Sequence, residues 1–158
     1  MAGLSKNYMR LALKEAAKNL KTLDGGPFGA CIVKGSKILA VARNKVLISD
    51  ATAHAEINAI RLASKKLKNF DLSGCVVYST TEPCPMCFSA IHWAGIDKVI
   101  YGTAIADARE IGFNELSIKC AKMKELGKSK VKIAPGFMLK ECKALFNEWG
   151  KLNKGIAY

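Results

Sequence analysis

Hydrophobic residues recur at three- and four-residue spacing over residues 5–20, and this pattern predicts an amphipathic helix near the start of the chain. A stretch rich in glycine and proline, 24–27, ends that helix. Two short apolar runs follow at 30–33 and 38–41, with a glycine-serine turn between them. The first part of the sequence therefore predicts a helix followed by a β-hairpin.

Strands and helices alternate along the rest of the chain. The apolar pattern predicts helices beginning near Ala53 and near Cys84, within about 107–126 and over roughly 139–151, and strands at 75–79, 98–102 and 131–134. Helical crossovers between such strands give parallel, right-handed pairs. Because no repeat or linker interrupts the pattern, we expect one domain, 1–158, an α/β fold with a three-layer α/β/α sandwich around a five-stranded mixed sheet.

Composition supports a globular domain. Half of the 158 residues are hydrophobic, and no apolar run approaches the roughly 20 residues that a membrane span requires. Six cysteines without a secretory signal favour the reducing cytoplasm. Four of them lie in apolar surroundings, where we expect them to pack in the core: Cys31, Cys75, Cys120 and Cys142.

The candidate chemistry lies in two short stretches, 52–56 and 82–87. They supply one imidazole, His54, and two thiolates, Cys84 and Cys87. Three protein ligands with a fourth position open to water form a catalytic zinc arrangement, whereas a structural site closes with a fourth side chain. Glu56, two residues beyond His54, is a spare carboxylate that can move protons for a zinc-bound water.

The local pattern places these ligands at helix N-termini. His54 opens an apolar-periodic segment, and Pro83 suits the first turn of a helix that begins around Cys84. Cys84 and Cys87 are three positions apart, so they face the same way. At helix N-termini, free N–H groups and the macrodipole favour thiolate and hydroxide. Both stretches follow strands, so we expect the site off the carboxyl ends of the sheet.

Two simpler interpretations compete with a catalytic zinc site. A lone C-x-x-C pair can be a redox motif, but that motif has no use for the upstream His-x-Glu. A structural zinc site needs a fourth ligand, and the only other histidine, His92, is expected to be an ordinary surface or core residue. The catalytic interpretation is therefore favoured.

His-x-Glu followed by Pro-Cys-x-x-Cys is the signature of zinc nucleobase deaminases. With it, the chain resembles the cytidine deaminase-like superfamily over nearly its whole length and is most similar to the bacterial guanine deaminases. The zinc motif is specific to the superfamily, while only the Gly-Phe element and the tail point to the guanine branch. The matching stretches are 25–30, 52–56, 82–87, 111–113, and Trp149 with Tyr158.

The resemblance implies zinc-dependent hydrolytic deamination of a free nucleobase, guanine to xanthine with ammonia release. Zinc lowers the pKa of its water to near 7 and so supplies hydroxide. Glu56 takes the water's proton, delivers it to a ring nitrogen and later helps ammonia leave. His54, Cys84 and Cys87 hold the metal throughout.

The resemblance also implies residues that bind the base. Asn44 contacts the ring, Phe28 and Trp93 form aromatic walls, and Glu115 reads the base. Alternatives stay open, since Asn44 also suits a turn and both aromatic residues also suit the core. Guanine deaminases carry an acidic pair after Gly-Phe, whereas this chain has an asparagine followed by Glu115. The loop at 50–52 also lacks a usual proline, and a glycine replaces a common arginine at position 95.

A C-terminal arm, 151–158, is the last element that the resemblance implies. In the guanine deaminases this segment closes over an active site, often that of a neighbouring subunit, and Tyr158 stands where its aromatic residue would cover the base. A homodimer is expected on the same ground. The alternative is a disordered terminus.

The net charge of the chain suggests the main alternative to a free-base deaminase. A net charge of +12 suits a tRNA adenosine (A-to-I) deaminase, which must hold a polyanion. However, only four of the 25 basic residues are arginines, and scattered lysine is more typical of a solvated surface. Cytosine deamination is a third hypothesis. A catalytically inactive RNA-binding module is a fourth, which the intact Glu56 disfavours.

Overall fold

The computed structural model describes residues 4–153 and 155–158. Its strands are β1 (Gly29–Lys34), β2 (Lys37–Arg43), β3 (Cys75–Thr81), β4 (Lys98–Thr103) and β5 (Lys132–Ala134). Its helices are α1 (Lys6–Ala17), α2 (Asn19–Thr22), the 3-10 helix η1 (Val46–Ile48), α3 (Ala55–Leu67), α4 (Pro85–Trp93), α5 (Ile105–Glu110), α6 (Cys120–Gly127) and α7 (Leu139–Leu152).

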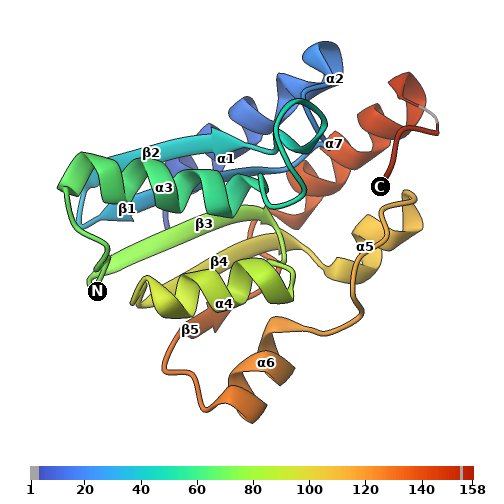
Figure 1. The fold of residues 1–158 in the computed structure, drawn as a ribbon. Helices are drawn as coiled ribbons and strands as arrows, with labels where there is room; N and C mark the ends of the chain where they lie inside the picture. Colours follow the sequence, from blue (N-terminus) through green and yellow to red (C-terminus); the bar gives the residue numbers. More distant parts are fainter. Residues whose placement is uncertain (1–3, 154) are drawn as a thin grey trace.

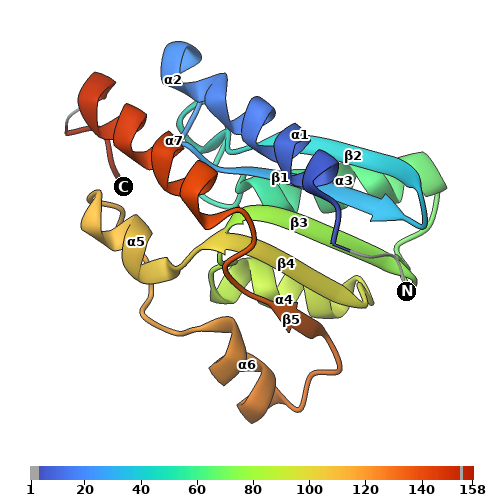
Figure 2. The same cartoon turned by 180° about the vertical axis from the view of Figure 1, so that it is seen from behind.

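The strands form one mixed sheet in the order β2-β1-β3-β4-β5. The hairpin partner β2 and the central strand β3 both run antiparallel to β1, whereas β3, β4 and β5 are mutually parallel. Helices α3 and α4 cover one face of the sheet, and α1 and α7 cover the other (Figures 1 and 2). The predicted three-layer sandwich around a five-stranded mixed sheet is confirmed.

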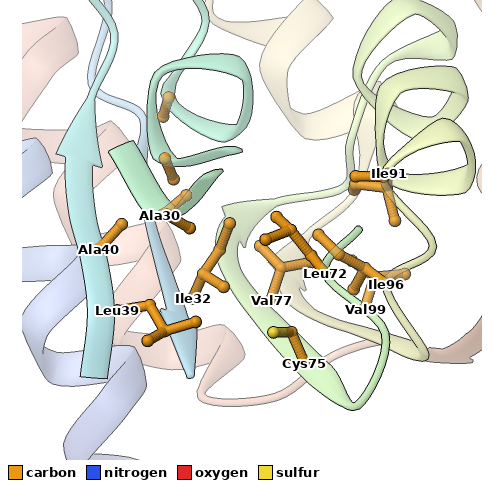
Figure 3. Close-up of a cluster of buried hydrophobic side chains, with 14 of the residues drawn as sticks. Ala30, Ile32, Leu39, Ala40, Leu72, Cys75, Val77, Ile91, Ile96 and Val99 are labelled. Carbon is orange, nitrogen blue, oxygen red and sulfur yellow. The ribbon is translucent and has the colours of Figure 1, made fainter. Parts of the chain in front are cut away.

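Successive side chains along each strand point to opposite faces of the sheet, and they divide the core into two layers. In β1, Ala30 and Ile32 pack beneath α3 and α4, while Cys31 and Val33 pack beneath α1 and α7. Figure 3 shows the first layer, in which Val77 of β3 meets side chains from β1 and β4. This period-two pattern is what the short apolar runs of the sequence indicate. The six cysteines are free, and the four predicted to pack in the core are buried.

Two helices differ from the sequence prediction. The first helix is divided after Ala17, and Asn19 begins the short α2 with its side chain fully buried. The helical stretch expected within 107–126 is two helices, because α5 ends just before Gly112, whose φ of 105° is a conformation that glycine adopts readily. The irregular segment 111–119 separates α5 from α6 and faces the end of the sheet that carries the ligands.

Within the described residues, no helix is both long enough and apolar enough to cross a membrane.

An ion-pair cluster joins the end of β2 to the first helices. Arg43 donates from Nη1 to Oε1 of Glu15 at 2.6 Å and from Nη2 to Oδ2 of Asp24 at 2.6 Å. Its Nε donates to Oδ1 of Asn19 at 3.0 Å. The planar guanidinium suits three acceptors at once, and its position fixes the chain immediately before Asn44.

We predict that Arg43→Ala lowers the free energy of unfolding by about 2–4 kcal/mol, because it leaves the largely shielded Asp24 without its cation and removes the more shielded of the two cations that pair with Glu15. Lys18→Ala is the matched control, since Lys18 pairs with the same Glu15 from a more exposed position. An exposed pair contributes about 0–1 kcal/mol. Urea denaturation measures both variants, and equal small losses would contradict the structural role of the cluster.

Candidate active site

The two ligand stretches meet because each one precedes a helix at the same end of the sheet. His54 is the N-cap of α3 and Cys84 is the N-cap of α4, both with extended backbone, and Cys87 lies in the first turn of α4. Helix α3 begins at Ala55, two residues later than predicted. Helix α4 begins at Pro85, one residue later than predicted, because proline is favoured at the first helical position. The carboxyl ends of β3 and β4 and the C-terminal segment lie at this same end (Figure 1).

The donor atoms have the spacing of a tetrahedral zinc site. Nδ1 of His54 lies 3.6 Å from Sγ of Cys84 and 3.5 Å from Sγ of Cys87. Zinc bonds of about 2.3 Å to sulfur and about 2.05 Å to nitrogen, at a tetrahedral angle, put nitrogen and sulfur about 3.6 Å apart. The described residues contribute no fourth side chain to this group, which fits a site whose last position is open.

The two thiols are prepared to bind a cation. A hydrogen bond from the Cys87 thiol is the largest cause that lowers the pKa of Cys84 to about 4. The same pairing, together with burial, raises the pKa of Cys87. One thiolate is therefore present at neutral pH, and binding of a cation displaces the proton of the second.

Glu56 lies in the first turn of α3 with its carboxyl group buried. Burial raises its pKa, and the Ser79 hydroxyl donates a hydrogen bond to its Oε1 at 2.8 Å. Sequence reasoning missed Ser79. The available signal was its position two residues beyond Val77, which places a polar group on the strand face that packs against α3.

A small cavity lies beside the metal ligands, and three of the predicted base-binding residues line it. The volume that the centre of a water molecule can occupy in this cavity is about 20 Å³. This is enough for roughly one water and far too little for a nucleobase. A base can therefore enter only if neighbouring side chains move. The lining residues are Phe28, Asn44, His54, Glu56, Thr81, Glu82, Cys84 and Glu115.

Tyr158 lies against this cavity without lining it. Its hydroxyl donates to Oδ1 of Asn44 at 2.7 Å and accepts a hydrogen bond from the Gly26 amide at 2.9 Å. Its ring packs edge-on against Phe113, with centroids 5.3 Å apart. Tyr158 is thus held against Asn44 and Gly26 of its own chain.

Asn44 is oriented by the bonds to its side-chain oxygen. Oδ1 also accepts from the amide of Val46 at 3.0 Å, so Nδ2 is the donor that this cavity-lining side chain offers. Beneath it, Nδ2 of Asn19 donates to the main-chain oxygens of Asn44 and Gly26, each at 2.8 Å. Gly25 is required beside it, because a Cβ there would lie 2.0 Å from Oδ1 of Asn44.

Glu115 brings a second carboxyl group to the cavity from the irregular segment between α5 and α6. Burial, with the negative Cys84 beside it, raises the pKa of Glu115 to about 7. A zinc dication in the ligand set acts in the opposite direction and favours the ionised carboxylate. The main-chain oxygen of Glu115 accepts a hydrogen bond from Arg109, which helps to hold the segment.

Trp93 is the one predicted base-binding residue that the structure does not bring to the site. Its side chain is 81% exposed at the end of α4. The helix rises about 1.5 Å per residue, so Trp93 lies about 9 Å along the axis from Cys87. In this chain it forms no aromatic wall of the cavity; Phe28 does line it.

Comparison with known proteins identifies the family. Residues 4–103 match the family described as the cytidine and deoxycytidylate deaminase zinc-binding region. The chain is 43% identical over 111 residues to a guanine deaminase of Bacillus subtilis, covering 70% of this chain and 71% of that one. It is 33% identical over 146 residues to a tRNA-specific adenosine deaminase of Buchnera aphidicola, covering 91% and 92%.

Solved structures agree with this assignment. A guanine deaminase from Nitrosomonas europaea superposes with a TM-score of 0.85 at 29% identity, covering 94% of this chain and 85% of that one. The Bacillus subtilis guanine deaminase gives a TM-score of 0.68 at 42% identity, with coverages of 71% and 72%. The predicted superfamily resemblance and the zinc cofactor are both confirmed. The chain belongs to the cytidine and deoxycytidylate deaminase zinc-binding family and is a zinc-dependent deaminase.

Proposed function

We propose that this deaminase converts free guanine to xanthine and releases ammonia. The observation that carries the proposal is the carboxyl group of Glu115, which lines the same small cavity as His54, Cys84 and Glu56. In guanine, the carbon that bears the amine has a ring N–H on one side. In adenine and cytosine, the corresponding ring nitrogen has no hydrogen. A carboxylate accepts a hydrogen bond from the former and repels the lone pair of the latter.

Asn44 supports the same base. Next to the ring N–H, guanine carries the O6 acceptor. Because Oδ1 of Asn44 already accepts hydrogen bonds, its Nδ2 offers a donor for such an acceptor. The Asn44 amide as a donor and the Glu115 carboxylate as an acceptor together complement the O6 and ring N–H of guanine. The guanine deaminases among the relatives support this proposal.

The reaction exchanges the amine for an oxygen from water. Zinc in the ligand set supplies a nucleophilic hydroxide near neutral pH. Glu56 takes one proton from the attacking water and passes it to the neighbouring ring nitrogen that has no hydrogen. It then takes the second proton, from the hydroxyl group now on the carbon, and gives it to the departing amine. Its raised pKa suits a group that both accepts and donates a proton, and Ser79 keeps its carboxyl group aimed at the cavity.

A tRNA adenosine deaminase is the second candidate. The match to the Buchnera enzyme spans most of both chains, and lysines 128, 130 and 132 border a surface hollow beside His92. The hollow shares no lining residue with the cavity that holds the metal ligands. The packing of Tyr158 beside Asn44 favours a free base, because it leaves little room for an attached ribose and phosphate chain. Cytosine remains the third candidate, as its deaminases are also relatives.

We further propose that the C-terminal arm closes the site. Helix α7 continues through Leu152, so the arm begins at Asn153 and not at position 151. The contacts of Tyr158 with Asn44 and Gly26 support closure by the chain's own arm. The homodimer stays a prediction, and so does an exchange of arms between subunits.

An ammonia-release screen tests the substrate. We expect guanine to be deaminated with a kcat/KM at least about 10³-fold above those of adenine, cytosine, their nucleosides and a tRNA anticodon stem-loop, because a site that bonds a substrate N–H rejects analogues without it by large factors. Glu115→Gln should lower the kcat/KM for guanine. Preferential deamination of the tRNA stem-loop or of cytosine would overturn the guanine assignment.

We expect Glu56→Gln to keep about one zinc per chain and the wild-type melting temperature, and to lose at least about 10²–10⁴-fold in turnover, because the amide cannot transfer protons. Cys84→Ala should lose zinc as well as turnover, and Cys75→Ala, which removes a core thiol, should keep both. Metal analysis after dialysis and steady-state rates measure these effects. Turnover near the wild-type value in Glu56→Gln would contradict the assigned role.

Truncation after Asn153 tests the arm. We expect free-base deamination to fall by at least about tenfold with zinc content unchanged, because water then has access to the reacting base. Tyr158→Phe keeps the ring and removes only the hydroxyl that joins Asn44 to Gly26, so its loss should be smaller. Unchanged or higher turnover in the truncated protein would show that the arm does not serve catalysis.

A further inference from the structure

Glu82 lies two residues before Cys84, at the carboxyl end of β3, and its side chain is only 5% exposed. Each of its two carboxylate oxygens accepts a hydrogen bond from a main-chain amide. Oε2 accepts from Ile105 at 3.2 Å and Oε1 accepts from Cys120 at 2.9 Å. These two amides belong to the first residues of α5 and α6.

This carboxylate contributes to the N-terminal capping of both helices, and at α5 it acts beside Asp107, which accepts a hydrogen bond from the Ala104 amide at 2.7 Å. The first amides of a helix have no partner inside it and are usually satisfied by the side chain that precedes the helix. Ala104 before α5 has no polar side chain, and Lys119 before α6 makes no such bond. Glu82 therefore supplies, from a distant part of the chain, the side-chain acceptor for the first amide of each helix. Among the described residues it takes part in no ion pair, so the two helix N-termini compensate its charge.

The segment between these anchors carries Glu115. Residues 111–119 contain neither helix nor strand, and they join the end of α5 to the start of α6. Phe113 packs against Phe28 and Tyr158, which holds the middle of the segment against the cavity. Glu82 fixes the helix that precedes the segment and the helix that follows it, so the position of the Glu115 carboxyl group depends on Glu82.

We propose that Glu82 is a positioning residue, which acts on the reaction by holding the segment 111–119 so that Glu115 faces the base. Because the role of Glu115 belongs to the proposed function, the inference rests on that function. The two oxygens of Glu82 are engaged with main-chain amides, and this distinguishes it from Glu56, whose partner is a hydroxyl group. The short motif around Cys84 thereby links the metal ligands to the group that selects the substrate.

A double-mutant cycle tests this dependence. Glu82→Gln keeps the shape but turns an NH₂ group toward one of the two amides, so one anchor is lost. We expect kcat/KM to fall roughly 10- to 100-fold with zinc content unchanged. In a Glu115→Gln background, the same change should cost less than about threefold, because the group that it positions is already absent. Equal losses in both backgrounds would overturn the proposal.

Glu110→Gln is the matched control, since it removes one carboxylate charge from an exposed site on α5. We expect it to leave kcat/KM within about twofold of the wild type. If Glu82→Gln does not fold, Glu82→Asp keeps the charge but shortens the reach by one methylene group, and the same cycle applies to it.

Amide hydrogen exchange gives a readout that does not depend on the substrate. In Glu82→Gln we expect exchange across 105–120 to be at least about tenfold faster, with α3 and the sheet unchanged. Unchanged exchange across 105–120 would overturn the anchoring role. A wild-type protein that fails to deaminate guanine refutes the proposed function alone, whereas a guanine deaminase with an additive cycle refutes only the role of Glu82.

Discussion

Zinc coordination imposes the tightest distance constraint on this fold. Nδ1 of His54 and Sγ of Cys84 are separated by 30 positions in the sequence and must come within 3.6 Å of each other. A metal site tolerates errors of only about 0.2 Å, which flexible loops do not achieve. Here each ligand is the N-cap of a helix, and both helices pack on the same face of the sheet. The core shown in Figure 3 thus serves to fix the distance between two helix ends.

Several polar groups are buried around this site, and each one has a defined partner. Asn19, Glu56 and Glu82 lose nearly all contact with water, which is costly for a polar group unless it is hydrogen-bonded. Glu56 is satisfied by a serine hydroxyl, and Asn19 and Glu82 are satisfied by main-chain groups. A domain selected only for stability would fill such positions with apolar side chains. The concentration of buried polar residues at one end of the sheet is therefore a mark of function.

The metal ligands and Glu56 could be predicted from the sequence because they stand at characteristic spacings within two short stretches. Ser79 and Glu82 could not, since their partners lie 23 and 38 positions away and only the folded sheet brings them together. Trp93 was assigned to the site by resemblance, but the direction of α4 carries its side chain to the surface. The irregular segment between α5 and α6 includes Gly112 with a φ of 105°, a conformation that no periodicity reveals.

The charge around the site differs from the charge of the chain as a whole. The chain as a whole has a net charge of +12, yet the cavity is lined by three carboxyl groups, those of Glu56, Glu82 and Glu115, and by the Cys84 thiol. Such a lining attracts a metal cation and N–H donors, and it opposes the close approach of phosphate. Lysines lie on the outer surface, where water and salt screen them. The local potential at the metal ligands is therefore governed by this lining and not by the net charge of the chain.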